Sequence, residues 1–233
     1  MPLPKDTSAK KESLKPATVR AGRPPNELAG AVDERILDAA YKVFMERGLN
    51  GASIDEIARL ARAGKPTIYA RFATKEALFA AVGMRNAARV TAHFGNYVTT
   101  GTTLEARLVS IGRDMLKQLL ADEVIDFMRL SAAEARRVPE LAHFGRNARE
   151  RGASVALTAL REAATPADIR RFPAFGPERI ETTVKFYLDL VVGPLLMRAL
   201  VGEGPKVLRA QIDAHVNSSV AFFLGGCAAV SRS

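Results

Sequence analysis

The chain has 233 residues, 48% of them hydrophobic, and its 34 Lys and Arg residues against 25 Asp and Glu residues give a net charge of +9. The single cysteine, Cys227, excludes a disulfide framework and a cysteine-built zinc site, and we expect it to be a small buried apolar residue. The positive charge favours a polyanionic partner, either nucleic acid or an anionic membrane surface. This length and composition predict a mainly helical chain with two domains.

Residues 1–30 are rich in Lys, Pro and Ser and carry six positive and three negative side chains. This composition predicts a disordered basic arm. The arm either follows a DNA duplex, with Arg20 and Arg23 in a minor groove, or is a solvated leader without a role, and the sequence leaves both readings open. The arm lacks the apolar core of a signal peptide, and the apolar runs at 188–197 and 219–230 are shorter than the roughly 20 residues of a membrane helix. We therefore expect a cytoplasmic protein with no membrane partner.

Apolar residues recur at helical spacing between residues 31 and 47 and predict a first helix. Gly48 is placed to end this helix, and Arg47 is favourable at the negative end of the helix dipole. The apolar stripe consists of Val32, Ile36, Ala40, Val43 and Phe44.

A second helix is predicted to begin at Ser53. With Glu56 three residues later, Ser53 forms a capping box, in which each side chain satisfies a backbone N–H of the first turn. This role does not exclude a hydrogen bond from the Ser53 hydroxyl to a DNA phosphate. The inward stripe of this helix consists of Ile54, Ile57, Ala58 and Ala61.

A short third helix follows a tight turn at residues 62–64. Lys65 and Pro66 suit its first turn, because proline loses no needed N–H there. The helix makes barely two turns, with Ile68 and Phe72 on one side and basic or donor side chains on the other. Two helices joined by a few residues, the second short and basic, are typical of a helix-turn-helix motif that contacts phosphates and base edges.

Residues 31 to 80 resemble the TetR family of bacterial transcriptional regulators. The matching residues are Ser53, Ile57, Ala58, Ala61, Lys65, Thr67, Ile68, Tyr69, Phe72, Lys75, Glu76, Leu78 and Phe79. The chain departs from the family pattern in the turn, where Arg62, Ala63 and Gly64 stand at the usual Gly, Val and Ser. We therefore expect Arg62 to bear the cost of a positive φ and the third helix to lack a serine cap.

The resemblance implies an all-α fold with two domains. A three-helix helix-turn-helix DNA-binding domain at residues 31–80 is followed by a larger helical effector-binding and dimerisation domain at residues 81–233. By the same resemblance, the protein is a sequence-specific regulator of transcription that binds a double-stranded DNA operator in the bacterial nucleoid. Repression relieved by an effector is the implied mechanism, and the sequence leaves activation open.

Four of the predicted DNA contacts are on the outward face of the third helix. Lys65, Thr67 and Arg71 are candidates for base edges, since the Arg71 guanidinium can form two hydrogen bonds with a guanine. By resemblance, Tyr69 and Lys75 hold phosphates. The full predicted set is Ser53, Lys65, Thr67, Tyr69, Arg71, Lys75, Arg20 and Arg23.

The rest of the chain is predicted to be helical. Thr74 is expected to cap a helix that runs to about residue 93 and joins the two domains. The segment 165–177 holds three prolines and is expected to be a loop or short turn, and the natural place for an opening. The apolar stripe of the last predicted helix either packs in the core of its own subunit or contacts a second copy of the chain. The resemblance favours the second reading, a four-helix dimer interface made by the last two helices of each subunit. The further predicted helices are 104–119, 124–138, 141–163, 180–201 and 207–225.

Dimerisation is also expected on physical grounds. One short recognition helix contacts few base pairs, and each bidentate contact contributes about 1–3 kcal/mol, too little to select one site in a genome. A homodimer doubles the contacts. It would read a palindrome whose half-site centres lie about one helical turn, roughly 34–36 Å, or a multiple of it apart.

By resemblance, the C-terminal domain holds a small, often apolar or aromatic effector. Aromatic, Met and His side chains among helices rich in Leu and Ala are candidates for its pocket, although core packing is the more frequent role for any one of them. The predicted lining residues are His93, Phe94, Tyr97, Phe127, Met128, Phe144 and Tyr187.

Other classes of protein fit the sequence less well. It has three scattered histidines and no GxGxxG, P-loop, GxSxG or HExxH motif, so we expect no enzyme, no metal and no cofactor. The alternative is a basic helical protein that binds nucleic acid nonspecifically or lies on a membrane surface. Its positive charge would be spread over one face, and it would have no helix that recognises base edges.

Overall fold

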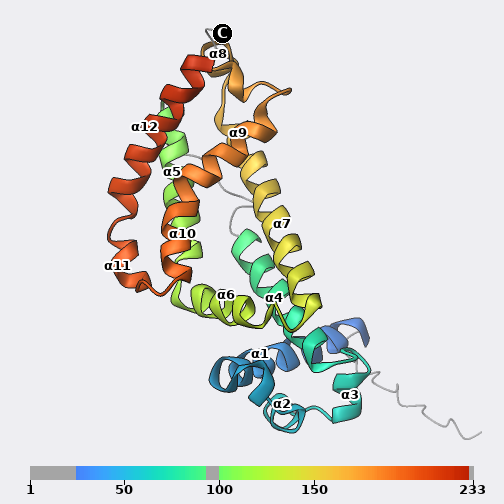
Figure 1. The fold of residues 1–233 in the computed structure, drawn as a ribbon. Helices are drawn as coiled ribbons and strands as arrows, with labels where there is room; N and C mark the ends of the chain where they lie inside the picture. The colour runs from blue at the N-terminus through green and yellow to red at the C-terminus, as the bar shows by residue number, and fades with distance from the viewer. Residues whose placement is uncertain (1–24, 93–99, 231–233) are drawn as a thin grey trace, which may run out of the picture.

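The computed structural model describes residues 25–92 and 100–230, and over them the fold is all-α (Figure 1). A small head made of α1, α2, α3 and the start of α4 lies at the bottom of the view, and a longer C-terminal part rises above it. The elements are α1 (Pro25–Gly51), α2 (Ile54–Ala61), α3 (Lys65–Tyr69), α4 (Lys75–Ala92), α5 (Leu104–Leu119), α6 (Asp122–Glu134), α7 (Pro139–Ala163), α8 (Pro166–Arg171), the 3-10 turn η1 (Pro173–Phe175), α9 (Ile180–Tyr187), the π turn η2 (Leu188–Val192), α10 (Gly193–Leu200), α11 (Pro205–Arg209) and α12 (Ile212–Val230).

The first helix is longer than its apolar stripe predicted. It begins at Pro25 rather than at residue 31, so residues 25–30 of the segment predicted as an arm are helical, and residues 1–24 lie outside the described residues. Gly48, with φ +68° and ψ 176°, kinks the helix at the position predicted to end it. Glycine adopts this positive φ without a steric cost, and the helix continues beyond the kink and ends at Gly51.

The head is built around one apolar core. Ile57, Ile68 and Leu78 bring α2, α3 and α4 together, and each is fully buried. The rings of Phe44 and Phe79 meet edge to face with their centroids 5.0 Å apart. Since α3 has only five residues, this packing and not its own hydrogen bonds holds it in place.

The helix α4 leads from the head into the C-terminal part. The backbone N–H of Ala77 donates to the Thr74 hydroxyl over 3.0 Å, which confirms the predicted cap. Arg85 then ties α4 to α1, with its Nη1 2.8 Å from Asp38 and 3.2 Å from Glu34. Beyond this point α4 runs beside α7 (Figure 1), so the head and the C-terminal part share one continuous helix.

The core of the C-terminal part lies between α5, α7, α9, η2 and α12. Tyr187 is fully buried there, and its hydroxyl donates to the backbone carbonyl of Leu108 over 2.7 Å. Gly112 makes this approach possible. A Cβ at position 112 would lie 2.8 Å from the Tyr187 hydroxyl and 2.6 Å from Val191.

The segment 165–177 is not the opening that its prolines led us to expect. Thr165 and Asp168 form a capping box that begins α8, and Asp168 also lies 2.6 Å from the Arg107 guanidinium of α5. The 3-10 turn η1 follows, and Phe172 and Phe175 are buried against the C-terminal core. Prolines at the first turn of a helix are compatible with helical structure, and here the segment closes the end of the domain.

The predicted helix at 180–201 is continuous but changes pitch. Pro194 lacks an N–H and crowds the carbonyl four residues earlier, and the chain accommodates it with the π turn η2 between α9 and α10. His215 of α12 lies against this turn, with its Nε2 2.9 Å from the Val191 carbonyl oxygen.

The last predicted helix is divided into α11 and α12. No helix in the two described stretches has the length and apolar character needed to cross a bilayer.

Candidate nucleic-acid interface

The two helices of the predicted DNA-binding motif form, with one difference at the start of α2 and one at the end of α3. The helix α3 ends at Tyr69, so Arg71 and Phe72 of the predicted third helix lie beyond it. The Ser53 hydroxyl accepts a hydrogen bond from the Asp55 N–H at 3.2 Å and caps α2. The Glu56 carboxylate, however, faces Arg47 of α1, with oxygen–nitrogen distances of 2.7 and 2.9 Å. The Glu56 half of the predicted capping box is therefore replaced by an ion pair that fastens α2 to α1.

The turn between α2 and α3 has the geometry expected from its unusual residues. Arg62 lies in the left-handed region, with φ 50° and ψ 47°, and its N–H points back to the Ala58 and Arg59 carbonyls. Gly64 stands at the N-cap of α3 and provides no side-chain hydrogen bond. The turn therefore keeps helix-turn-helix geometry at the expense of backbone strain and a lost cap.

We expect Arg62→Gly to raise the free energy of unfolding by about 0.5–1 kcal/mol, because glycine adopts a positive φ without the steric penalty that other residues incur. The Arg62 side chain is exposed, so little packing is lost. Urea titration followed by circular dichroism measures the change. Arg59→Gly is the matched control: Arg59 is exposed within α2, where glycine should destabilise the helix by roughly 1 kcal/mol. Equal destabilisation by both variants would contradict the strain at Arg62.

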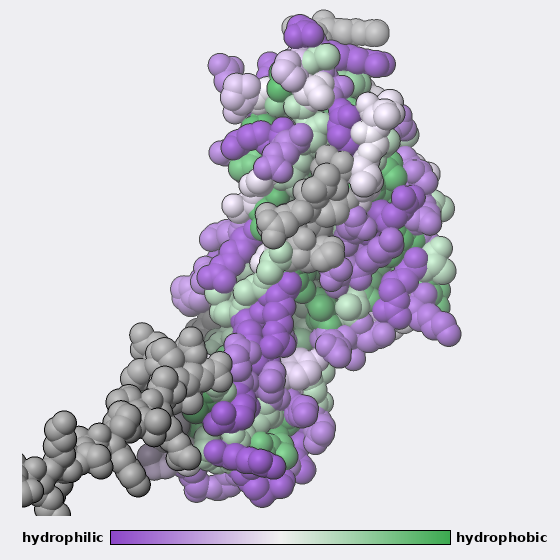
Figure 2. All heavy atoms as spheres, turned by 180° about the vertical axis from the view of Figure 1, so that it is seen from behind, coloured by the Kyte–Doolittle hydropathy of each residue, from purple (hydrophilic) through white to green (hydrophobic). Residues whose placement is uncertain are grey.

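The outward face of α3 is available for contact with DNA. Ile68 points into the head core, while the Tyr69 side chain is 50% exposed and Lys65 is exposed beside it. Thr67 is partly exposed in the same helix. Seen from behind, hydrophilic side chains cover most of the visible surface of the head, with small apolar areas between them (Figure 2).

The basic side chains around α3 have partners within the protein. Lys65 Nζ lies 2.5 Å from an Asp55 carboxylate oxygen, and this hydrogen bond raises the pKa of Lys65, which keeps its ammonium charged. The Arg71 Nε pairs with the Asp33 carboxylate of α1, and the Arg71 Nη1 donates to the Thr67 carbonyl over 3.3 Å. The candidate base-reading cations are therefore held by acidic residues.

Lys75 has a different environment from the other two cations. Its ammonium donates to the Asn50 and Ala52 carbonyls, both at 3.2 Å, and so holds the start of α4 against the α1–α2 connection. Lysine has three donor hydrogens, which leaves one for a phosphate. The remaining predicted DNA contacts, Arg20 and Arg23, lie outside the described residues.

Sequence reasoning missed the two carboxylates on this surface. Asp33 is 38 residues from Arg71, and the periodicity of α1 carries no signal for such a pair. Asp55 was recognisable as an outward residue of α2, and its contact with Lys65 depends on the angle of the turn.

The comparisons with known proteins agree with this geometry. The sequence profile of bacterial regulatory proteins of the tetR family matches residues 36–82, and that of the AefR-like transcriptional repressor C-terminal domain matches residues 106–227. The chain belongs to the TetR family. It is a helix-turn-helix DNA-binding regulator of transcription, and the resemblance seen in residues 31 to 80 is confirmed.

Relatives of this TetR-family regulator include named repressors. An HTH-type transcriptional repressor of Mycobacterium tuberculosis is 29% identical over 187 residues, which cover 79% of this chain and 90% of the relative. An HTH-type transcriptional repressor of Streptomyces coelicolor is 48% identical over 52 residues, which cover 22% of this chain and 27% of the relative.

Solved structures of TetR-type regulators share the fold. A TetR-family transcriptional regulator from Mesorhizobium loti superposes with a TM-score of 0.71 at 23% identity, covering 84% of this chain and 96% of that one. The Bacillus subtilis regulator FadR in complex with stearoyl-CoA superposes with a TM-score of 0.61 at 16% identity, covering 80% and 97%. The predicted all-α fold, with an N-terminal helix-turn-helix head and a larger helical C-terminal domain, is confirmed.

The predicted effector residues of this TetR-family regulator do not form one cluster in the described structure. His93, Phe94 and Tyr97 lie outside the described residues, as does the side chain of Phe144 in α7. Tyr187 is fully buried in the C-terminal core. Met128 is partly exposed on α6.

Phe127 of α6 packs in the core of the head and not in the C-terminal core. It is 3% exposed, and its ring stacks on Phe79 with a centroid distance of 4.9 Å and an angle of 19°. Two residues along α6, the Arg129 guanidinium donates to the Ala199 carbonyl over 2.6 and 3.1 Å, at the end of α10. The helix α6 therefore joins the head to the C-terminal part (Figure 1).

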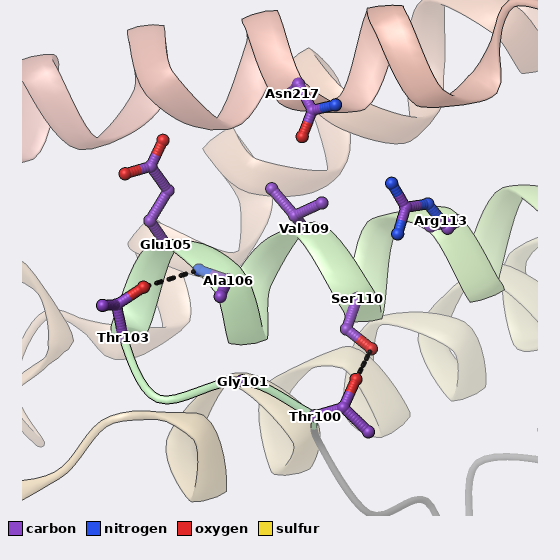
Figure 3. Close-up of a pocket in the computed structure, with 9 residues that line it drawn as sticks. All are labelled: Thr100, Gly101, Thr103, Glu105, Ala106, Val109, Ser110, Arg113 and Asn217. Carbon is purple, nitrogen blue, oxygen red and sulfur yellow. Dashed lines mark hydrogen bonds between the residues drawn. The ribbon is translucent and has the colours of Figure 1, made fainter.

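A hollow of about 460 Å³ lies between α5, the segment before it and α12 (Figure 3). The hydroxyls of Thr100 and Ser110 are 2.9 Å apart, Arg113 follows Ser110 on α5, and Asn217 comes from α12. The hollow is polar, and no residue of the predicted effector set lines it. Its lining residues are Thr100, Gly101, Thr103, Glu105, Ala106, Val109, Ser110, Arg113 and Asn217.

Cys227 is a buried residue of α12. Burial raises the pKa of its thiol to about 11, so the thiol stays protonated at neutral pH. This agrees with the small apolar role expected from the sequence.

Proposed function

We propose that this TetR-family regulator is a repressor that binds a palindromic operator as a homodimer and releases it when a small effector binds. The observation that carries the proposal is the surface of α3, where Tyr69 and Lys65 are exposed on a helix fixed from beneath by Ile68. A rigid helix with outward donors is what base and phosphate contacts in a major groove require.

An apolar surface on the C-terminal part supports the homodimer. Phe186, Met197 and Phe222 are 60, 60 and 74% exposed, and they lie on α9, α10 and α12. Large apolar side chains exposed on neighbouring helices mark protein interfaces. We call Phe186, Met197, Val201, Val207 and Phe222 the apolar surface.

The effector is proposed to be a small apolar or aromatic molecule. Support for an apolar portion comes from the FadR structure, which contains stearoyl-CoA, a ligand with a long apolar acyl chain. His93, Phe94, Tyr97, Met128 and Phe144 are the proposed lining residues, whereas the positions of Phe127 and Tyr187 are those of packing residues. The effector is proposed to fit only the arrangement in which the spacing of the two recognition helices does not match the operator. Its binding then lowers the population of the DNA-binding arrangement, to an extent set by the difference between its affinities for the two arrangements.

A competition experiment tests the proposed function. Fragments of the source genome are selected with the purified full chain, and the recovered site is challenged with random duplex of the same length. The repressor should retain one palindrome against about a thousandfold excess of random duplex. Equal displacement would favour the nonspecific basic protein instead.

We expect substitutions on α3 and in the residues that follow it to separate phosphate contacts from base contacts. Tyr69→Ala or Lys75→Ala should weaken binding to all duplexes by a similar factor, because phosphates carry no sequence information. Arg71→Ala should relax the choice at one base position, at roughly 1–3 kcal/mol of discrimination. Binding to a panel of single-base operator variants measures both effects. An equal loss of selectivity in all three variants would refute these roles.

A further inference from the structure

Two carboxylates neutralise the candidate base-reading cations in the absence of DNA. Asp33 of α1 pairs with the Arg71 Nε, and Asp55 of α2 lies 2.5 Å from Lys65 Nζ. Both acids come from a helix other than α3, and their side chains remain 42 and 68% exposed. Lys75, a proposed phosphate contact, is instead held by uncharged backbone carbonyls.

We infer that Asp33 is a positioning residue that acts through Arg71, because its carboxylate competes with DNA for the guanidinium. The inference rests on the proposed function, because it requires Arg71 to face the operator. The Arg71 side chain is 28% exposed and lies two residues after α3, with its Nε held by Asp33 and its Nη1 by the Thr67 carbonyl. A contact with DNA through either nitrogen competes with these partners.

The competition has the same cost for both kinds of DNA contact, because the Asp33–Arg71 pair must be broken whether the guanidinium then meets a phosphate or a guanine edge. Exposed ion pairs of this kind change an equilibrium by only about two- to fivefold. A guanine edge accepts two parallel hydrogen bonds from arginine, which discriminate by about five- to 150-fold. Asp33 therefore lowers affinity by at most the strength of the pair, and the correct base still draws Arg71 away from it.

Asp33 gives a cleaner test than Asp55. Asp55 lies in the first turn of α2, where its charge also stabilises the positive end of the helix dipole. Removing that charge would change the stability of the head as well as the pairing of Lys65. Asp33 lies inside the long helix α1, away from its first turn, so Asp33→Asn changes the partner of Arg71 with little effect on the helix.

The test measures binding of full-length Asp33→Asn to random duplex and to the selected operator over a range of salt concentrations. Affinity for random duplex should rise by at most about fivefold, and the slope of log K against log salt should become steeper by up to about 0.9, the value for one added phosphate contact. Operator affinity should rise by at least as large a factor, about two- to fivefold, because the stronger base contact recovers the whole cost of the pair. The control is Asp126→Asn, which removes the same charge from a partly exposed pair with Arg129 beyond the first turn of α6 and should leave the slope unchanged.

A second variant assigns the effect to Arg71. In Asp33→Asn combined with Arg71→Ala, the gain on random duplex should disappear. A gain that persists in the double variant, or a salt slope of Asp33→Asn equal to that of Asp126→Asn, would overturn the inference. If the wild-type chain fails to prefer any operator, the proposed function is wrong, and the random-duplex slope still decides the role of Asp33.

Discussion

Phe127→Ala should lower the free energy of unfolding by about 3–5 kcal/mol, although the residue lies in α6 and outside the predicted DNA-binding domain. Its ring fills the space beside Phe79 and Tyr41, and alanine would leave a cavity at the junction of the two parts. The head would also be held less firmly, so operator affinity should fall. Urea titration and operator binding of the same preparation measure the two effects.

Met128→Ala is the matched control on the same helix. Met128 is partly exposed, so its truncation should destabilise the protein by less than about 1 kcal/mol. If Phe127→Ala were as mild as Met128→Ala in urea and instead abolished the effector response, Phe127 would line an effector site, as the sequence first predicted.

Phe222→Glu should convert the proposed homodimer into monomers. Phe222 is the most exposed phenylalanine of the apolar surface, and a carboxylate buried there in a dimer would have no partner. Leaving one charge uncompensated costs at least about 3 kcal/mol, which is more than about a hundredfold in the dimer dissociation constant. Sedimentation velocity over a range of protein concentrations measures this constant.

Ser154→Glu adds the same charge at an exposed position of α7, which lies across the C-terminal part from α12 (Figure 1). It should leave the dimer intact. Operator binding should fall with dimerisation in Phe222→Glu only, because a monomer contacts one half-site. A Phe222→Glu protein that stays dimeric would place the interface elsewhere.

The local structure of the head could be predicted because its signals are local. Ser53, Thr74 and Gly48 act within a few residues of themselves. Ser53 and Thr74 cap their helices as their residue types indicate, and Gly48 kinks the helix that it is predicted to end. The positive φ at Arg62 followed from the family resemblance, because Arg62 stands where the family pattern has Gly. Family resemblance then supplied the arrangement of the helices, which periodicity alone does not determine.

Features that depend on distant contacts were not predictable. Phe127 has the same local pattern whether it faces an effector pocket or the head, and only the path of α6 distinguishes the two. Three prolines in 165–177 predict a loop, whereas the capping box at Thr165 begins a helix there and Asp168 fastens it to Arg107 of α5. The pairing of Asp33 with Arg71 belongs to the same class, because tertiary structure brings the two residues together.

The position of Phe127 has a consequence for building chimaeras. A graft that moves only the first four helices onto another regulator would carry Phe79 and Tyr41 without the ring that covers them. A chimaera that exchanges the head should therefore include α6 of the donor, or use a recipient whose own α6 provides an equivalent ring. In this chain the unit that can be transplanted is discontinuous, and its boundaries follow the aromatic stack and not the order of the sequence.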